Sequence, residues 1–306
     1  MKLTIVICSH NRSELLTIAL NSIYNAVKPV NYNISVLVIA NACTDTTLTD
    51  LEQYKIKQSI YCQDIPLLIE EESKKGKSFA LNRAINIVKE GYLCFMDDDQ
   101  MLDKEYFKAV LNALNDYPDS TMLCGPLHAD WKGIEPKWIY ETGKYQINPL
   151  PFPLFDLGNM TLLITDEIQT PPGGQVIIRR DVFTRVGKFR EDLGPTGHNL
   201  VGSEDTDFFL RAIKNNEIFR YIPSIIQYHH IDYDRFKITY LINNSFKRNR
   251  SLTIALYSKN KPPLYLWLKL LNYFFKALLS FNSIRIRYYL VRCAAISGQI
   301  SGYLKK

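Results

Sequence analysis

Cysteine is scarce in this chain, and its few copies are scattered. The 306 residues include six cysteines, none of them in a CxxC pair, and most lie within apolar runs. A disulfide framework and a thiolate zinc site are therefore disfavoured, and we expect reduced core cysteines of a cytosolic protein. The apolar run at the N-terminus, residues 3–8, is too short for a signal peptide. A cytoplasmic location is the expectation.

Acidic residues are missing from the C-terminal part. Residues 235–306 contain 14 lysines and arginines but no aspartate or glutamate, whereas residues 1–234 hold 23 basic and all 31 acidic residues. The net charge of +6 thus hides a strongly basic tail. This asymmetry indicates an anionic partner for the tail, either a membrane or nucleic acid. No nucleic-acid reading motif accompanies the tail, so we expect no nucleic acid.

Short apolar runs rich in Ile and Val alternate with helical patterns through the first hundred residues. The 46% hydrophobic content is enough for one large domain or a domain plus an appendage. The pattern predicts an α/β fold with a mostly parallel, doubly wound sheet flanked by helices. Strands are expected at 3–8, 35–40, 59–62, 67–69 and 92–96, helices at 13–26, from 44–47 onward and at 79–88, and an edge strand at 225–228.

Three consecutive aspartates, Asp97, Asp98 and Asp99, follow the predicted strand 92–96. The carboxyl edge of an open α/β sheet is where ligands bind, and adjacent carboxylates repel unless a cation lies between them. A divalent metal holding a diphosphate fits this pattern, and oxygen ligands suit Mg²⁺ or Mn²⁺. The alternative is a solvated acidic turn at the start of the next helix.

The other predicted loops carry groups that a nucleotide requires. Asp45 can accept a hydrogen bond from a base N–H, and Lys75 and Lys77 flank Gly76 at a helix N-terminus suited to phosphate. The alternative for each is a helix cap or a solvated lysine. A P-loop is rejected because its upstream glycine is missing.

Seven short motifs, in order, make residues 1 to about 235 resemble the family-2 glycosyltransferases of the GT-A fold, which are inverting and depend on nucleotide sugars. The motifs are Ser9-His10-Asn11-Arg12, Asn41-Ala42-Cys43-Thr44-Asp45, Gly76-Lys77-Ser78 with Ala80 and Asn82, Asp97-Asp98-Asp99, Pro172-Gly173-Gly174 with Arg179-Arg180, Val186-Gly187-Lys188-Phe189-Arg190-Glu191, and Gly202-Ser203-Glu204-Asp205-Thr206-Asp207 with Arg211. Two features depart from the family pattern: His10 precedes Asn11-Arg12, and the third aspartate leaves the choice of metal ligand open.

The resemblance implies a role for each matching position. Asp45 would bind the base, Asp97 would contact the nucleotide or sugar, and Asp99, ahead of Asp97, would ligate Mn²⁺ or Mg²⁺. Asp205, beside Glu204, would be the catalytic base. The donor would be a UDP- or GDP-sugar. The full set of expected nucleotide-sugar-binding residues is Ser9, Asn11, Arg12, Asn41, Asp45, Lys75, Gly76, Lys77, Asn82, Asp97, Asp98, Gly173 and Gly174.

The chemistry of transfer agrees with two carboxylate sites. Departure of a nucleoside diphosphate leaves negative charge, which a divalent cation stabilises. The attacking hydroxyl loses its proton, so one carboxylate suffices as general base. Glu204-Asp205 opens a predicted helix at 206–214, whose N-terminus favours an ionised Asp205. The alternative is an acidic helix start without chemistry.

Aromatic residues are frequent between these two sites, in residues 126–172. Sugars stack on such rings, which makes this stretch the expected acceptor region, although the rings can equally be packing beneath a long loop. The aromatic residues concerned are Trp131, Trp138, Tyr140, Tyr145 and Phe152.

Two further groups are candidates for the phosphate side of the site. His229 and His230 follow the predicted strand 225–228, and either imidazole is an expected metal neighbour. Arg248 and Arg250 are expected to neutralise the departing diphosphate. The Gln-x-x-Arg-Trp signature of processive enzymes is absent, so synthesis of long chains through a membrane pore is disfavoured.

The C-terminal part, residues 236–306, is predicted to be a basic, amphipathic helical extension to a catalytic domain at 1–235. The helix expected at 264–281 has a narrow polar stripe that includes Lys269 and Lys276. Two lysines at mid-span argue against a membrane crossing, whereas aromatic and basic content suits a helix in the interface with anionic lipid. Arg285, Arg287 and Arg292 would meet the head groups. The alternative is packing on the protein.

The sequence thus predicts a cytoplasmic glycosyltransferase, peripheral on the inner membrane face, that acts on a glycan or lipid-linked acceptor in cell-envelope polysaccharide biosynthesis. Two alternatives remain open. A sugar-nucleotide pyrophosphorylase shares the sheet and metal, but 9–12 lacks its glycine-rich loop. A membrane-docked glycan-binding protein without turnover would not need Asp205.

Overall fold

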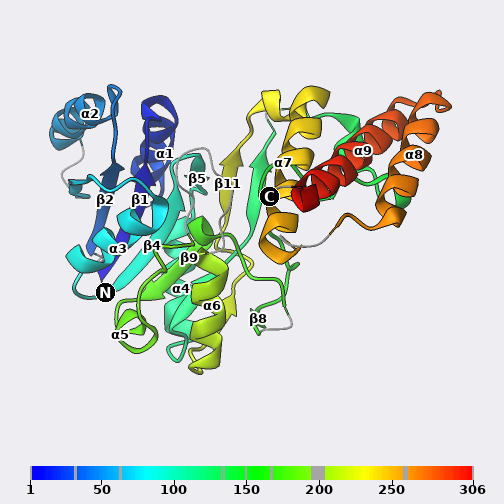
Figure 1. Ribbon diagram of the computed structural model, residues 1–306. Coiled ribbons are helices and arrows are strands. Elements are labelled where there is room, and N and C mark those ends of the chain that lie inside the picture. Colours follow the sequence, from blue (N-terminus) through cyan, green and yellow to red (C-terminus); the bar gives the residue numbers. More distant parts are fainter. Residues whose placement is uncertain are drawn as a thin grey trace. The chain divides into compact units, whose positions relative to one another are not determined.

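The computed structural model describes residues 2–30, 33–61, 64–131, 133, 135–148, 150–165, 168–193, 204–257 and 261–304. Contacts divide the chain into two compact units (Figure 1). We call Met1–Asp130 with Leu154–His230 the sheet unit, and Trp131–Pro153 with Ile231–Lys306 the helical unit. The boundary predicted at residue 235 lies close to His230, where the chain passes from the sheet unit to the helical unit for the second time. Residues 131–153 group with the C-terminal helices and not with the predicted catalytic region.

Within the part that the structure describes, eight strands form the main sheet of the sheet unit. Their spatial order is β3 (Leu67–Glu72), β2 (Asn33–Asn41), β1 (Lys2–Ser9), β4 (Tyr92–Asp97), β9 (Val176–Arg179), β6 (Met122–Cys124), β10 (Phe219–Tyr221) and β8 (Leu162–Leu163). The first four strands are parallel, β9 runs antiparallel to both neighbours, and β8 is antiparallel to β10. The predicted mostly parallel α/β sheet is confirmed.

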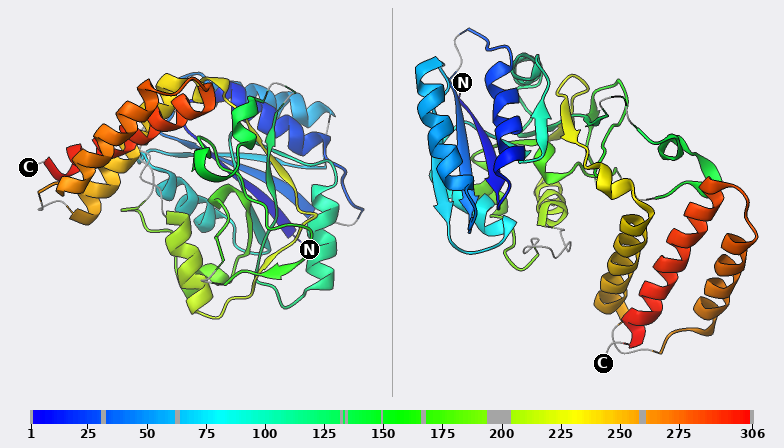
Figure 2. Two further views of the ribbon diagram at one scale, coloured as in Figure 1. Left: turned by 90° about the vertical axis from the view of Figure 1, so that its right-hand side faces the viewer. Right: turned by 90° about the horizontal axis from the view of Figure 1, so that it is seen from above.

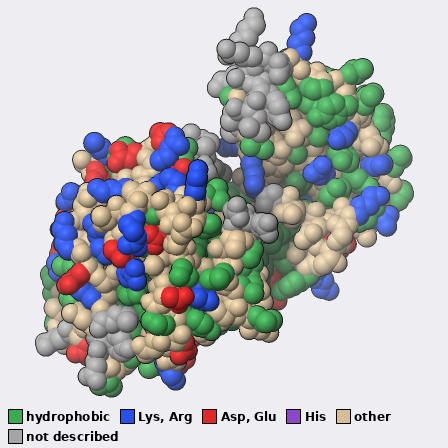
Figure 3. Space-filling model, turned by 90° about the horizontal axis from the view of Figure 1, so that it is seen from below, with side chains coloured by type: hydrophobic (Ala, Val, Ile, Leu, Met, Phe, Trp, Pro, Cys, Tyr) green, Lys and Arg blue, Asp and Glu red, His purple; other side chains and the backbone are tan. Residues whose placement is uncertain are grey.

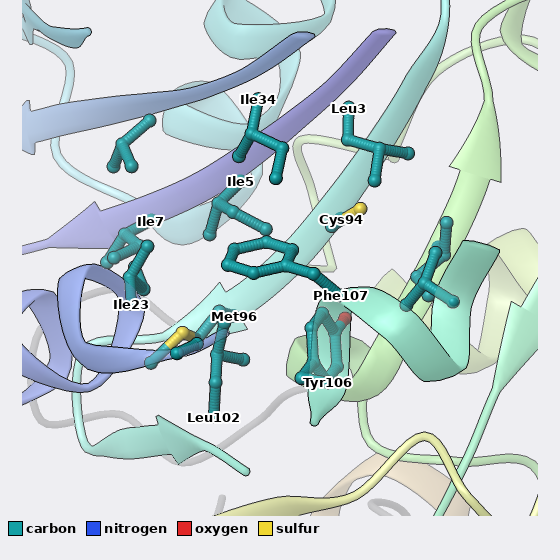
Figure 4. Packing of buried hydrophobic residues seen from close by; sticks show 14 of the residues in the cluster. Leu3, Ile5, Ile7, Ile23, Ile34, Cys94, Met96, Leu102, Tyr106 and Phe107 are labelled. Carbon is teal, nitrogen blue, oxygen red and sulfur yellow. The ribbon is translucent and has the colours of Figure 1, made fainter. Parts of the chain in front are cut away.

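Alternate residues of each strand point to opposite faces of this sheet, and each face packs against its own set of helices. In β1, Leu3, Ile5 and Ile7 belong to one core and Val6 to the other. The first core contains residues of α1 (Ser13–Asn25), α2 (Thr47–Tyr61) and α4 (Tyr106–Asp116), whose Phe107 lies beside Ile5 in Figure 4. The second contains residues of α3 (Lys77–Ile87), α5 (Val182–Val186) and α6 (Glu204–Lys214). This arrangement is doubly wound.

A second, three-stranded sheet lies in the same unit. Its order is β5 (Gln100–Leu102), β11 (Gln227–His230) and β7 (Leu127–Asp130), with β11 antiparallel to β5 and parallel to β7. The edge strand predicted at 225–228 is therefore wrong in position and type. It begins two residues later, includes both histidines, and is paired on both sides, which a single-sequence pattern of apolar residues does not reveal.

The strand predicted at 59–62 is also wrong. Residues 59–61 are the last residues of α2, and Cys62 lies outside the described residues. Ile60 is a β-branched residue of the kind that suggests a strand, but it lies 69% exposed on the solvent side of the helix. The β propensity is outweighed because a helix that has begun at Thr47 gains one backbone hydrogen bond with each residue added.

Among its described residues, the helical unit has the α-helices α7 (Ile238–Tyr257), α8 (Leu264–Leu278) and α9 (Ser283–Leu304), visible together in Figure 2. Gly298 and Gly302 of α9 allow close approach to α7: a Cβ added at Gly298 would lie 2.3 Å from the carbonyl oxygen of Phe246. None of the helices described combines the length and apolar content required to span a membrane. Short 3₁₀ turns complete the fold at Lys137–Tyr140, Gly143–Tyr145, Gly173–Gln175 and Tyr233–Phe236.

The aromatic residues of the predicted acceptor region mostly pack on other rings. Trp131 packs against Phe152 and Phe236, and Trp138, 6% exposed, packs against Phe236. Tyr140 is 61% exposed. The packing alternative thus accounts for most of these rings, while their role toward an acceptor stays a prediction.

An ion pair links α5 to the loop between α6 and β10. Arg185 of α5 donates two hydrogen bonds, 2.5 and 2.8 Å long, to Glu217, whose side chain is 4% exposed. Hydrogen bonds from Arg185 lower the pKa of Glu217, against the opposing effect of burial. Because the folded pKa is depressed, this pair stabilises the protein above the unfolded pKa of about 4.3 and the stability is lost as pH falls through the folded value.

We therefore expect Glu217→Gln to lower the free energy of unfolding at pH 7 by about 2 kcal/mol. The difference from the wild type should shrink toward zero as the pH falls below 4, as measured by urea unfolding. The control is Glu90→Gln, which removes an exposed pair with Lys2 and should cost less than about 0.5 kcal/mol. A deficit that is independent of pH would contradict the assignment.

Candidate active site

The carboxyl ends of three adjacent strands bring the predicted loops together. Ser9, Asn41 and Asp97 are the last residues of β1, β2 and β4, and the register pairs Ser9 with Ala40 and Cys8 with Asp97. Since these strands are parallel, the loops that follow them emerge at the same edge of the sheet. The sequence motifs therefore meet in one place, as predicted from the strand pattern.

Each of the three aspartates contacts a cationic side chain from another element. Lys77, the first residue of α3, donates to Asp97 at 2.6 Å. Arg12, from the loop after β1, donates to Asp98 at 2.9 Å and to Asp99 at 3.2 Å. Three adjacent carboxylates are thus compatible in one turn because two basic residues neutralise most of their charge.

Burial gives these groups different proton affinities. Desolvation raises the pKa of Asp98 to about 6, although Arg12 partly offsets it. Burial also acts to raise the pKa of Asp97, but the charge and hydrogen bond of Lys77 outweigh it, and the net shift is downward. Lys77 in turn has a raised pKa, because Asp97 and Glu204 overcome its own desolvation. We therefore interpret Asp98 as a structural carboxylate. Its Oδ2 also accepts a hydrogen bond from the Ser9 hydroxyl at 2.7 Å.

Gln100 fixes the backbone of the aspartate turn, a role that was not predicted from the sequence. Its side-chain carbonyl accepts a hydrogen bond from the backbone N–H of Asp97 at 3.1 Å, and the residue is fully buried. A polar residue that directly follows an acidic motif is the sole signal in the sequence. Its contact depends on the turn between β4 and β5.

The second sheet brings a histidine to the third aspartate. The Nε2 atom of His229 lies 3.6 Å from Oδ1 of Asp99, and the backbone N–H of His230 donates to the carbonyl of Asp99 at 2.7 Å. Because side chains alternate along a strand, His230 points to the other face of β11. Of the two predicted histidines, His229 is therefore the one whose imidazole lies beside Asp99.

The donors around Asp99 suit a metal held jointly with a ligand. Over the described ranges, no group of three or more His, Cys, Asp or Glu side chains can hold a metal by itself. Asp99 and His229 supply one carboxylate oxygen and one imidazole nitrogen, and the remaining positions would fall to diphosphate oxygens and water. The pair fits Mn²⁺ better than Mg²⁺, which favours an all-oxygen shell. Lys77 binds Asp97 at 2.6 Å, whereas Arg12 binds Asp99 at the longer distance of 3.2 Å, so Asp99 stays the ligand expected first.

Two neighbouring glycines bring the second carboxylate site to the first. The N–H of Gly173 donates to Oδ2 of Asp205 at 2.9 Å, and a Cβ added at Gly174 would lie 2.6 Å from the carboxyl carbon of Asp97. Because consecutive Cα atoms are 3.80 Å apart, this bounds the distance between the two carboxylates at about 13 Å. Asp97 and Asp205 therefore face one backbone segment.

Glu204 and Asp205 occupy the first turn of α6. Glu204 is 3% exposed, burial raises its pKa, and its Oε2 has no hydrogen-bond partner within the described structure. Oδ1 of Asp205 accepts the N–H of Thr206 at 2.7 Å. Lys77 acts electrostatically on both residues, so one lysine links the aspartate turn to the start of α6.

Several predicted binding residues have structural partners. Asn41 accepts the N–H of Gly76 at 2.9 Å and donates to the carbonyl of Lys74, so it shapes the loop in which Lys75 is exposed. Asn11, at a φ of 55°, accepts the N–H of Thr44. Asp45 accepts the N–H of Thr47, the capping role weighed as its alternative.

Three further predicted residues, Asn82, Arg248 and Arg250, belong to other elements. Asn82 is 6% exposed and exchanges hydrogen bonds with the backbone of Phe189, which fixes the loop after α5. Arg248 and Arg250 belong to α7 in the helical unit. Their predicted contacts to sugar nucleotide and diphosphate stay predictions.

Comparison with known proteins gives the family. Residues 4–187 match the family described as "Glycosyl transferase family 2". The chain belongs to this family. The glycosyltransferase is 29% identical over 105 residues to the poly(ribitol-phosphate) beta-glucosyltransferase of Bacillus spizizenii, a match covering 34% of this chain and 16% of that relative. The chain therefore spans well under two thirds of that protein.

Two solved structures share the fold of the glycosyltransferase. Residues 1–349 of Staphylococcus aureus TarS, in complex with UDP, align with a TM-score of 0.56 and 16% identity over 99% of this chain and 90% of that one. The mannosyltransferase PcManGT from Pyrobaculum calidifontis, in complex with GDP-Man and Mn²⁺, aligns with a TM-score of 0.57 and 15% identity over 98% and 85%. The GT-A fold is thereby confirmed.

The paired glycines give a test that separates the two carboxylates. Gly174→Ala should displace Asp97 and raise the KM for the sugar donor at least about tenfold, because the new Cβ overlaps the carboxyl group. Gly173→Ala should chiefly lower kcat, since its Cβ would lie 3.0 Å from that of Asp205. Steady-state kinetics of donor hydrolysis or transfer measures both. The same change in KM and kcat for both variants would contradict the division of roles.

Proposed function

We propose that the chain is an inverting glycosyltransferase that moves a sugar from a nucleotide-sugar donor to a hydroxyl of a glycan or lipid-linked acceptor. The observation that carries this proposal is that two carboxylates contact one backbone segment: Asp205 lies against Gly173, and Asp97 lies against Gly174. Because glycine has no Cβ, both carboxylates can lie directly against this backbone segment. Membership of glycosyl transferase family 2 supports the reaction class.

The donor is proposed to be a UDP- or GDP-sugar bound at the carboxyl edge of β1, β2 and β4. TarS has been crystallised with UDP and with UDP-GlcNAc, and PcManGT with GDP-Man, on the same fold. In this chain Lys77 supplies a positive charge close to Asp97, and Arg12 supplies a second one beside Asp98. Both charges favour an anionic diphosphate.

The leaving group is proposed to depart with the help of Asp99 and His229. These two side chains would hold Mn²⁺, which supplies positive charge to the two phosphates as the bond to the sugar breaks. Arg12 limits the negative charge of the turn, while His230 and Gln100 fix its backbone through the carbonyl of Asp99 and the N–H of Asp97. The turn is thus rigid before the donor arrives.

Asp205 is proposed to be the general base. The acceptor oxygen forms a bond to the anomeric carbon, the bond from that carbon to the phosphate oxygen breaks, and the proton of the acceptor hydroxyl passes to a carboxylate oxygen of Asp205. The N–H groups of Gly173 and Thr206 orient this carboxylate. Attack from the face opposite the leaving group inverts the configuration, and no covalent sugar intermediate is needed.

The acceptor is proposed to be a hexose-accepting polymer or lipid of the cell envelope. The relative from Bacillus spizizenii is a poly(ribitol-phosphate) beta-glucosyltransferase, which supports polysaccharide biosynthesis as the setting. Residues 126–172 remain the proposed acceptor region, with Tyr140 as an exposed ring. A hexosyl donor is part of the same proposal.

Attachment to an anionic membrane is proposed for α8. The inward residues of this helix are Leu266, Leu270, Tyr273 and Ala277, at the helical spacing of one narrow stripe. The opposite side exposes large apolar residues, each at least half exposed: Leu264, Leu268, Leu271, Phe275 and Leu278. Lys269 and Lys276 lie on the flank of this face. This pattern supports our proposal of an interfacial helix, with the enzyme on the cytoplasmic face of the membrane.

The proposed mechanism predicts that Asp205→Asn lowers kcat about 10²-fold to 10⁴-fold and leaves donor affinity within about threefold. Transfer and hydrolysis would be measured against a panel of UDP- and GDP-sugars. The matched control is Asp207→Asn, on the same helix turn but paired with Arg211, which should retain activity. Full activity of Asp205→Asn, or no turnover of any donor by the wild type, would instead favour a glycan-binding protein.

The proposed attachment predicts that Leu271→Gln, Phe275→Gln and Leu278→Gln combined reduce co-sedimentation with phosphatidylglycerol vesicles at least about tenfold, because about 2 kcal/mol per buried apolar side chain is lost. The control changes two exposed apolar residues of another helix, Ile56→Gln with Ile60→Gln, and should sediment like the wild type. Equal sedimentation of all three proteins would refute the role of α8.

A further inference from the structure

A hollow of about 400 Å³ lies between the three helices of the helical unit. Its walls come from α7 with Arg250, from α8 with Trp267 and Leu270, and from α9 with Ser297, Ser301 and Leu304. A volume of this size falls within the range of small-molecule sites. The hollow lies in residues that the proposed transfer reaction does not use.

Small residues on α9 keep the hollow open. Ser297 and Ser301 are four residues apart, so both hydroxyls face the same side of the helix. Neither hydroxyl makes a hydrogen bond to any residue in the described ranges. Next to them, Gly298 and Gly302 allow α9 to lie against the backbone of α7 at Phe246 and Arg250. The wall therefore offers two unused donors on a rigid support.

Among the described residues, Arg250 differs from three other arginines of this unit in lacking an aromatic partner. Arg285, Arg287 and Arg292 each lie over an aromatic ring, those of Tyr145, Trp138 and Tyr273. Arg250 has no ion pair, no ring partner and no hydrogen bond for its buried Nε among the described residues. Residues 236–306 contain no aspartate or glutamate that could neutralise it. Within the described residues, no acidic side chain forms an ion pair with Arg250.

We infer that this hollow binds the phosphate group of an amphiphilic lipid. Arg250 would pair with the phosphate, Ser297 and Ser301 would donate to its oxygens, and the apolar walls at Leu270 and Leu304 would receive the hydrocarbon. A free anion would leave those walls unused. The inference reassigns Arg250 from the diphosphate of the donor to a lipid phosphate.

The hollow is also placed for such a ligand. Trp267 lines it and is itself 43% exposed, on the flank of the apolar face of α8 that is proposed to lie in the membrane. The face of the helical unit seen in Figure 3 shows mainly hydrophobic and basic side chains. The inference deepens the proposed membrane attachment and rests on it for the source of the lipid, either the bilayer itself or a lipid-linked acceptor.

The experiment measures lipid binding by the full chain without any sugar donor, using calorimetry. The probes are dihexanoyl phosphatidic acid and farnesyl phosphate, with dihexanoylglycerol, farnesol and inorganic phosphate as comparisons. Arg250→Met removes the charge, Ser301→Phe fills the hollow, and Lys276→Met removes an equal charge from the exposed part of α8. Thermal unfolding of each variant verifies that it is folded.

We expect both lipid phosphates to bind, and Arg250→Met and Ser301→Phe each to weaken binding about tenfold or more, with Lys276→Met within about twofold of the wild type. Tighter binding of farnesyl phosphate would identify an isoprenyl acceptor, and tighter binding of phosphatidic acid a bilayer lipid; either supports the site. Binding unchanged in both hollow variants, or equal binding of the phosphate-free lipids or of inorganic phosphate, would overturn it. Since no donor is present, failure here leaves the proposed transfer reaction untouched.

Discussion

The constraint on which this structure depends is the proximity of three carboxylates in one turn. Asp97, Asp98 and Asp99 would repel one another strongly at low dielectric, and burial makes the cost larger. The fold meets this cost with charges from distant elements: Lys77 from the start of α3 and Arg12 from the loop after β1. The turn is therefore stable only when the sheet has formed. Because three carboxylates face two basic side chains, the turn keeps an excess of negative charge, which suits a divalent cation.

The rest of the sheet unit places reacting groups around that turn. The second sheet delivers His229 to Asp99, and the Gly173-Gly174 segment joins Asp97 to Asp205. These contacts bring together residues that are 32 to 130 positions apart in the sequence. The helical unit carries a different kind of surface, basic and apolar, with Arg250 lining its hollow. The proposed sugar transfer and the proposed lipid contact thus belong to different units of the chain.

Much of the fold could be predicted from the sequence because strand and helix periods are local. The acidic turn at the end of β4 and the grouping of loops at one edge follow from that pattern. The partners could not be predicted: nothing local states that Lys77 pairs with Asp97, or that one Arg12 serves two aspartates. The register of β11 decides between His229 and His230, and residues 131–153 join the helical unit through packing that has no sequence period. The strand predicted around Ile60 was wrong because the β propensity of that residue is weaker than the tendency of α2 to continue.

The most direct measurement is the binding of Mn²⁺ to the full chain, followed by electron paramagnetic resonance with and without UDP or GDP. The account predicts weak binding to the chain alone, because Asp99 and His229 supply only two ligands, and binding at least about tenfold tighter with the nucleoside diphosphate. Asp99→Asn should abolish that enhancement. Mn²⁺ binding that is indifferent to the diphosphate, or unaltered by Asp99→Asn, would contradict the central role given to the aspartate turn.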